Sequence, residues 1–156
     1  MKRISFGWSG IGSLRDELRR PIARISAEFG HPAWRGASTV TLWRADSTGL
    51  KIFTQMYDVE IKLEVGVLNF EPASSLNPDE QIVDLKGRFE DEIDASKLII
   101  TESGVSVESG LVLTGKNEIE IVPGGFPLTL ALRGIEFHSP AFEPEYPWER
   151  YQRLAF

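Results

Sequence analysis

Two histidines, His31 and His138, limit the acid–base and metal chemistry of this chain, which contains no cysteine. Glu136 and His138 are two residues apart, so a strand would present both side chains on one face. Glu143 or Glu145 could approach the same point from the following segment. Imidazole and carboxylate groups together can bind a metal ion or transfer a proton. Binding or hydrolysis of a small ligand at Glu136 and His138, in a barrel mouth or cleft, is therefore one of two functions that we consider.

The glycine-rich stretch GWSGIG, residues 7–12, lacks residues that known glycine-rich sites require. A phosphate loop needs a lysine after its last glycine, and a dinucleotide fingerprint needs a glycine where Arg15 stands. A nucleophile elbow needs a glycine where Ile11 stands. The sequence also lacks histidine pairs at metal-binding spacing and calcium-loop patterns. These observations favour a non-catalytic protein with no cofactor and no metal.

Charge is unevenly distributed along the chain, whose net charge is −6. Residues 58–108 contain thirteen acidic and four basic side chains (−9), whereas residues 1–57 contain four acidic and nine basic ones (+5). Nucleic-acid binding needs clustered Lys and Arg to neutralise phosphates, so the acidic stretch argues against it. The same stretch suits pairing with a basic protein partner, as in an immunity or accessory protein.

Aromatic residues with charged neighbours are the candidates for a binding surface. Trp34 and Arg35 lie in HPAWRG, where we expect a loop, and both residue types are enriched among interface hot spots. Trp34 could equally close one end of the domain. A second group lies in FEPEYPWERY, residues 142–151. The predicted binding residues are Trp34, Arg35, Glu143, Glu145, Tyr146, Trp148 and Arg150.

The two prolines in FEPEYPWERY stiffen the chain, because each fixes its own φ angle and biases the preceding residue towards extended geometry. A stiff segment loses little conformational entropy when it docks, and burial of one large aromatic ring contributes about 2–3 kcal/mol. We therefore expect residues 142–156 to form a C-terminal strap that is docked on the domain. A binding epitope for a partner is the alternative.

Alternation of apolar and polar residues predicts a mainly β fold. Residues 59–67 alternate as one half-buried strand. Turn residues predict hairpins at DSTG (46–49) and GKN (115–117), and residues 82–93 favour strand over helix. About nine short strands separated by turns are typical of a single antiparallel β domain, either a sandwich or an open barrel.

A short helical segment is expected near the N-terminus, within residues 13–29. Ser13 can cap its start, Leu14 and Leu18 share one face, and Pro21 should kink or divide it.

The length of 156 residues fits one domain, residues 1–156. No apolar run is long enough to cross a bilayer, and polar residues near the start interrupt any signal peptide, so we expect a cytoplasmic protein without membrane contact. Self-association through an exposed sheet edge is a third possibility. Composition leaves the oligomeric state, the partner and the process open.

Overall fold

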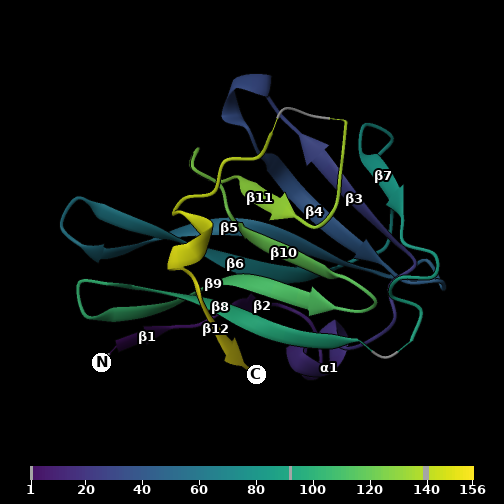
Figure 1. Cartoon of the computed structure of the whole chain (residues 1–156), viewed down its shortest axis with the longest axis horizontal. Coiled ribbons are helices and arrows are strands. Elements are labelled where there is room, and N and C mark those ends of the chain that lie inside the picture. The colour runs from purple at the N-terminus through teal and green to yellow at the C-terminus, as the bar shows by residue number, and fades with distance from the viewer. Residues whose placement is uncertain (1, 92, 139–140) are drawn as a thin grey trace.

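The computed structural model describes residues 2–91, 93–138 and 141–156 (Figure 1). These residues form one mixed sheet of 12 strands and one short α-helix, which confirms the mainly β fold predicted from the sequence. The helix α1 is Leu14–Leu18, and two 3₁₀ turns are η1, Pro32–Trp34, and η2, Trp148–Arg150. The strands are β1 Lys2–Ile4, β2 Gly7–Trp8, β3 Arg24–Phe29, β4 Ala37–Trp43, β5 Gly49–Glu60, β6 Leu63–Ala73, β7 Gln81–Asp84, β8 Asp94–Glu102, β9 Val105–Thr114, β10 Glu118–Pro123, β11 Leu130–Arg133 and β12 Gln152–Ala155.

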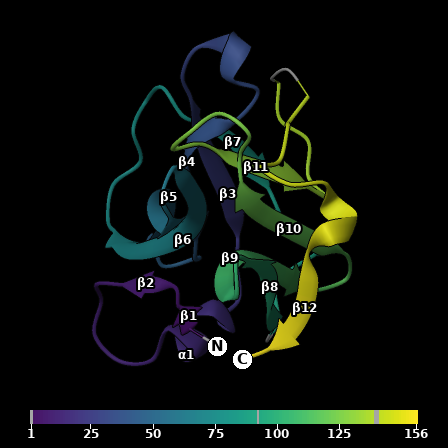
Figure 2. The same ribbon diagram turned by 90° about the vertical axis from the view of Figure 1, so that its left-hand side faces the viewer.

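The strands follow the order β12-β8-β9-β10-β11-β4-β5-β6-β2, with β3 between β4 and β7 and with β1 beside β9. The β1–β9 and β2–β6 pairs are parallel, and the other pairs are antiparallel. The sheet curls so strongly that β6 returns towards β9 (Figures 1 and 2). Because no ladder joins β6 to β9 within the described ranges, the sheet is open at this seam.

Side chains close the seam between β6 and β9. The hydroxyl of Ser109 donates a hydrogen bond of 3.0 Å to the carbonyl of Gly66. Four buried valines pack together around this point: Val65, Val67, Val105 and Val107. A further link crosses the inside of the curl, where the Thr54 hydroxyl donates to the carbonyl of Thr129 at 2.6 Å.

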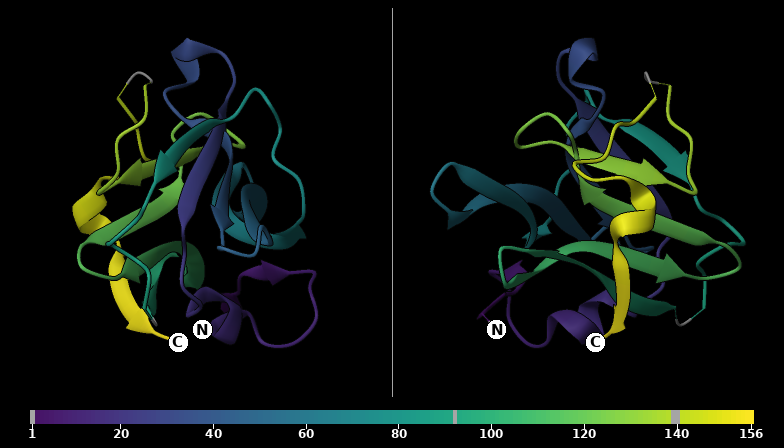
Figure 3. Two further views of the ribbon diagram at one scale, coloured as in Figure 1. Left: turned by 90° about the vertical axis from the view of Figure 1, so that its right-hand side faces the viewer. Right: turned by 60° about the vertical axis from the view of Figure 1, so that its left-hand side comes forward.

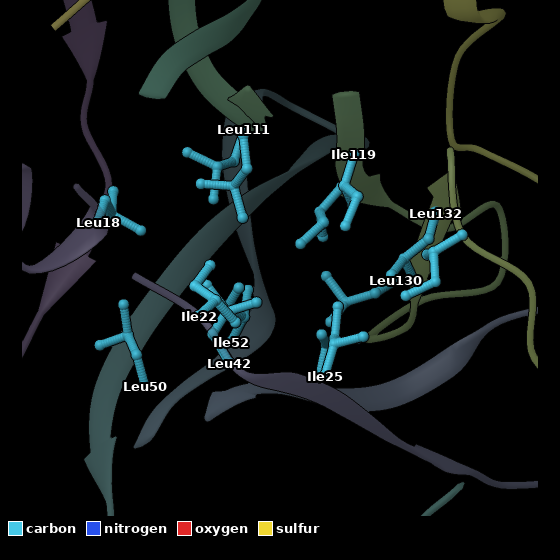
Figure 4. Close-up of a cluster of buried hydrophobic side chains, with 14 of the residues drawn as sticks. Leu18, Ile22, Ile25, Leu42, Leu50, Ile52, Leu111, Ile119, Leu130 and Leu132 are labelled. Atoms are coloured by element: carbon cyan, nitrogen blue, oxygen red, sulfur yellow. The ribbon is translucent and has the colours of Figure 1, made fainter. Parts of the chain in front are cut away.

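The hydrophobic core fills the inside of the curl (Figure 4). Aliphatic side chains from β4 and β5 face those from β9, β10 and β11, and Leu18 of α1 joins them from the N-terminal segment. Full burial of each such side chain contributes about 1.5–3 kcal/mol to the stability of the folded state. Packing of the inward-facing residues therefore stabilises the curled sheet. The labelled members of this cluster are Leu18, Ile22, Ile25, Leu42, Leu50, Ile52, Leu111, Ile119, Leu130 and Leu132.

Residues 59–67, which the sequence predicts as one strand, are instead a hairpin. β5 ends at Glu60, the chain turns at Ile61 and Lys62, and β6 begins at Leu63. Lys62 has φ of 62°, a conformation that turns usually assign to glycine or asparagine. The prediction is wrong because Ile-Lys carries no turn signal. The hairpins predicted at 46–49 and 115–117 are confirmed as the β4–β5 and β9–β10 connections.

The helix expected within residues 13–29 is confirmed only at its start. Ser13 caps α1 by accepting a hydrogen bond from the Asp16 N–H at 3.3 Å, but the helix ends at Leu18, before Pro21. Arg24–Phe29 form β3 because they pair with β4 on one side and with β7 on the other. Tertiary pairing here overrides a pattern that also fitted a helix.

The strand favoured for residues 82–93 is correct only at its start. β7 ends at Asp84, and Gly87 has φ of 79° in the turn that follows. The apolar residues beyond this point are buried in the core but belong to no strand. Alternation of apolar and polar residues alone cannot tell such buried loop residues from strand residues. Leu85 and Phe89 both lie in the core.

Substitution of Gly66 tests the seam. A Cβ atom at Gly66 would lie 2.6 Å from the Cβ of Pro123, whose ring has little freedom to move. We expect Gly66→Ala to lower the free energy of unfolding by about 1–3 kcal/mol in chemical denaturation, because it overpacks the seam. Gly125→Ala is the matched control, since the nearest atom to its new Cβ would be the Pro144 carbonyl oxygen at 3.4 Å. Equal losses in both variants would contradict the role of the seam.

Candidate functional site

Two loops at one end of the sheet bring aromatic side chains together. The η1 turn follows His31, whose Nδ1 accepts a hydrogen bond from the Ala33 N–H at 3.1 Å. Trp34 at the end of η1 stacks on Phe126 from the β10–β11 loop, with ring centroids 5.1 Å apart and planes 15° apart. Leu128 lies in the same loop as Phe126. We call Trp34, Phe126 and Leu128 the apolar patch.

The apolar patch is open to solvent although its backbone is well ordered by hydrogen bonds. Phe126 is 45% exposed and Leu128 is 59% exposed. The loop is closed by Thr129, whose hydroxyl donates to the Phe126 carbonyl at 2.6 Å and whose own carbonyl accepts from the Gly124 N–H at 2.8 Å. Leu128 has φ of 64°, a left-handed conformation that costs a branched side chain about 1–2 kcal/mol. The fold therefore holds an exposed leucine in an unfavourable backbone conformation.

Arg35 and Glu143 connect η1 to the C-terminal segment beside this patch. The Glu143 N–H donates to the Arg35 carbonyl at 3.0 Å, and the Glu143 carbonyl accepts from the Gly125 N–H at 2.8 Å. The two side chains also lie 3.8 Å apart, but both are exposed, so this ion pair contributes little to stability. Three of the predicted binding residues, Trp34, Arg35 and Glu143, are thus brought together at one end.

The other predicted binding residues, Glu145, Tyr146, Trp148 and Arg150, contact the chain's own sheet. The η2 turn, drawn in yellow, lies over the strands of the sheet (Figure 3). Trp148 lies under the guanidinium group of Arg133 at 4.5 Å, and Tyr146 lies under that of Arg150 at 4.5 Å. Arg150 also donates to the carboxylate of Glu102 on β8.

After η2, Tyr151 packs against Leu98 and Val112 and is only 8% exposed, and β12 pairs with β8. These contacts support a structural role for residues 142–156. That this segment is a stabilising strap stays a prediction.

Glu145 is the most strongly perturbed of these side chains. Both of its carboxylate oxygens lie 3.1 Å from the Gly66 nitrogen, and its own N–H donates to the Pro123 carbonyl at 2.9 Å. Burial raises the pKa of Glu145 to about 7, and the hydrogen bond from Gly66 only partly offsets this effect. Burial and the nearby charge of Glu145 also raise the pKa of Tyr146 to about 12. Glu145 is therefore held half-buried at the seam.

The structure does not bring Glu136 and His138 to one pocket. His138 lines a depression of about 210 Å³ together with His31, Arg35 and Gln81. Glu136 lines a separate and more open depression beside Arg133. Among the residues that the structure describes, no three His, Asp or Glu side chains are grouped so that they could hold a metal ion.

Sequence reasoning missed Phe126 and Leu128. The stretch LTLALR, residues 128–133, predicts a strand from its sequence, but β11 begins only at Leu130. Two glycines precede Phe126, and Pro127 follows it, so this stretch carried a turn signal. Apolar residues on both sides of a turn proline were the sign that the loop is apolar and exposed.

Comparison with known proteins found no similar protein or family. No protein-family model matches the chain, and no curated protein and no solved structure is significantly similar to it. In the part of the chain that the structure describes, no helix combines the length and apolar character needed to span a bilayer.

Truncation of Tyr151 tests whether the C-terminal segment stabilises the domain. We expect Tyr151→Ala to lower the free energy of unfolding by about 3 kcal/mol, because it removes a buried ring from a packed cluster. Leu154→Ala on the neighbouring strand β12 is the control. Because Leu154 is 41% exposed, this substitution should lower the free energy of unfolding by less than about 1 kcal/mol. Urea denaturation followed by tryptophan fluorescence measures both. A small effect of Tyr151→Ala would favour the epitope alternative.

Glu145 should make stability depend on pH near neutrality. Its folded pKa of about 7 exceeds the unfolded value of 4.5, so the folded state binds more protons between these values. Its contribution to stability is therefore complete below about pH 4.5 and is lost as the pH rises through 7. Glu145→Gln keeps an acceptor for Gly66 without this titration. The melting temperature of the variant should exceed that of the wild type at pH 8, and the difference should shrink towards pH 5. Parallel pH profiles would refute this effect.

Proposed function

We propose that the protein is a non-catalytic interaction protein that binds a protein partner through the apolar patch. The observation that carries the proposal is Leu128, an exposed leucine held at φ of 64° in the same loop as Phe126, whose ring is also exposed. Neither feature stabilises the domain, because an exposed apolar side chain gains nothing from burial and its backbone conformation is unfavourable. A contact that buries Leu128 in a partner would explain both the exposure of this leucine and its left-handed backbone.

Composition and order of the patch support the same function. Tryptophan and arginine are enriched among the residues that dominate binding energies, and Trp34 lies beside Arg35. The hydrogen bonds of Thr129, together with the stacking of Trp34 on Phe126, hold the patch in one arrangement before any partner binds. A surface that is already ordered loses less entropy on association.

The partner that we propose is a protein with a basic surface. Residues 58–108 carry the large excess of acidic side chains, which would accelerate association with a cationic partner and repel nucleic acid. An immunity or accessory protein that neutralises a basic protein has these properties. A cytoplasmic location belongs to the same proposal.

The alternative, a ligand-binding or hydrolytic cleft that uses Glu136 and His138, has weaker support. The two side chains line different depressions, which gives a shared cleft less support than the apolar patch has. His138 shares its depression with Arg35 rather than with a carboxylate. We therefore favour the interaction function.

A polar substitution at Leu128 tests the proposal. Asparagine tolerates a left-handed backbone, so Leu128→Asn should keep the melting temperature of the wild type or raise it. The same variant should lose the partner, because the patch loses an exposed apolar side chain. Leu76→Asn is the matched control, since Leu76 is also an exposed loop leucine.

The partner is identified by affinity capture from the host and quantitative mass spectrometry, and the captured protein is then purified and titrated by calorimetry. A partner whose purified form binds the wild type and the Leu76→Asn variant, but binds the Leu128→Asn variant at least about tenfold more weakly, supports the proposal. Equal affinities for all three proteins would overturn it.

A further inference from the structure

The end of the β5–β6 hairpin, residues 57–64, projects from the same side of the molecule as the loop that carries Phe126 and Leu128 (Figures 1 and 3). We call these residues the hairpin tip. Ile61 at its turn is 91% exposed, and Tyr57 is also exposed. Isoleucine is a poor turn residue, and Lys62 beside it takes a left-handed conformation. The tip thus exposes apolar surface where a polar Asn-Gly turn would serve the fold better.

Two of the charged side chains near Ile61 destabilise the hairpin. Asp58 on β5 lies directly opposite Glu64 on β6, and both side chains are exposed. Like charges in directly opposed positions of a sheet destabilise it. At the other end of the same two strands, Lys51 lies opposite Glu71 and forms an ion pair of 3.6 Å. The ladder therefore uses a compatible pair near the core and an incompatible one at its exposed end.

None of the ion pairs of the described ranges involves a residue of the hairpin tip. Asp58, Glu60 and Glu64 give the tip three negative charges, against one positive charge on Lys62. This net charge of −2 favours Lys and Arg in a partner that meets Ile61.

We propose that the hairpin tip is a docking site for a basic segment of a protein partner. Lysine or arginine side chains of the partner lie between Asp58 and Glu64, and an apolar side chain of the partner covers Ile61. This proposal rests on the proposed function and names the chemistry of the partner: a segment in which basic and apolar residues are interspersed. A second copy of this chain is a poorer occupant, because two acidic tips repel each other.

A pair of synthetic peptides tests the docking site directly. The probe is a twelve-residue peptide of alternating lysine and leucine, and the comparison peptide replaces every lysine with glutamate. Each is titrated into the full-length ¹⁵N-labelled protein while amide chemical shifts are followed. We expect the lysine peptide to shift amides of residues 57–64 and the glutamate peptide to leave them unchanged. Added salt should weaken the binding of the lysine peptide, because it screens the exposed charges.

The charge pair is removed in the variant Asp58→Asn/Glu64→Gln. It should bind the lysine peptide at least about tenfold more weakly. Its melting temperature should stay the same or rise, because a repulsive pair is lost. The control, Asp79→Asn/Glu136→Gln, removes the same charge from exposed positions outside the tip and should bind like the wild type. A lower melting temperature of the tip variant would indicate a structural role for the two carboxylates and would overturn the proposal.

Other results also decide against the docking site. Shifts spread evenly over the acidic surface, or equal weakening in the control variant, would show non-specific attraction. Dimerisation that Ile61→Asn abolishes, measured by light scattering, would assign the tip to a second copy of the chain.

The outcome is separable from that of the apolar patch. If Leu128→Asn loses the host partner while the tip variant retains its full affinity for both that partner and the peptide, the proposed function stands and the docking site fails. If the peptide binds the tip as expected but Leu128→Asn retains every partner, the patch fails and the docking site stands.

Discussion

The arrangement of the whole sheet depends on the seam at which β6 returns to β9. Both backbone groups of Gly66 are satisfied there by side chains: the Ser109 hydroxyl binds its carbonyl, and the Glu145 carboxylate binds its N–H. Without these partners the inner edge of β6 would hold buried polar groups, each of which costs about 1–3 kcal/mol when it is unpaired. The absence of a side chain on Gly66 lets Pro123 approach closely. One residue thus sets how far the sheet can curl.

Local patterns predicted the strands well where each one ended in a recognisable turn, as at residues 46–49 and 115–117. They failed at Ile61 and Lys62, because the turn there contains neither glycine nor asparagine, and at β3, because its pairing partners lie on distant strands. The apolar patch could not be derived from sequence, since Trp34 and Phe126 meet only through the folding of the sheet. The separation of Glu136 from His138 likewise follows from how the chain continues after β11.

Local disadvantages in this protein are concentrated on one side of the molecule. Leu128 with its left-handed backbone, Ile61 in its turn and the opposed carboxylates of Asp58 and Glu64 all lie in the hairpin tip and the neighbouring loop (Figure 3). Sequences that fold reliably agree with local preferences at most positions, and exceptions gather at functional sites.

The short hydrogen bond from Thr54 to Thr129 joins the hairpin to the loop of the apolar patch. Thr54 lies on β5, a few residues before the hairpin tip, and Thr129 follows Leu128 directly. This hydrogen bond ties the base of the hairpin to the loop that carries Leu128. On the proposed function, a partner held at one of the two elements would meet the other at a high effective concentration, so two weak contacts would combine into one strong association. The distance between the elements would then select partners by geometry as well as by charge.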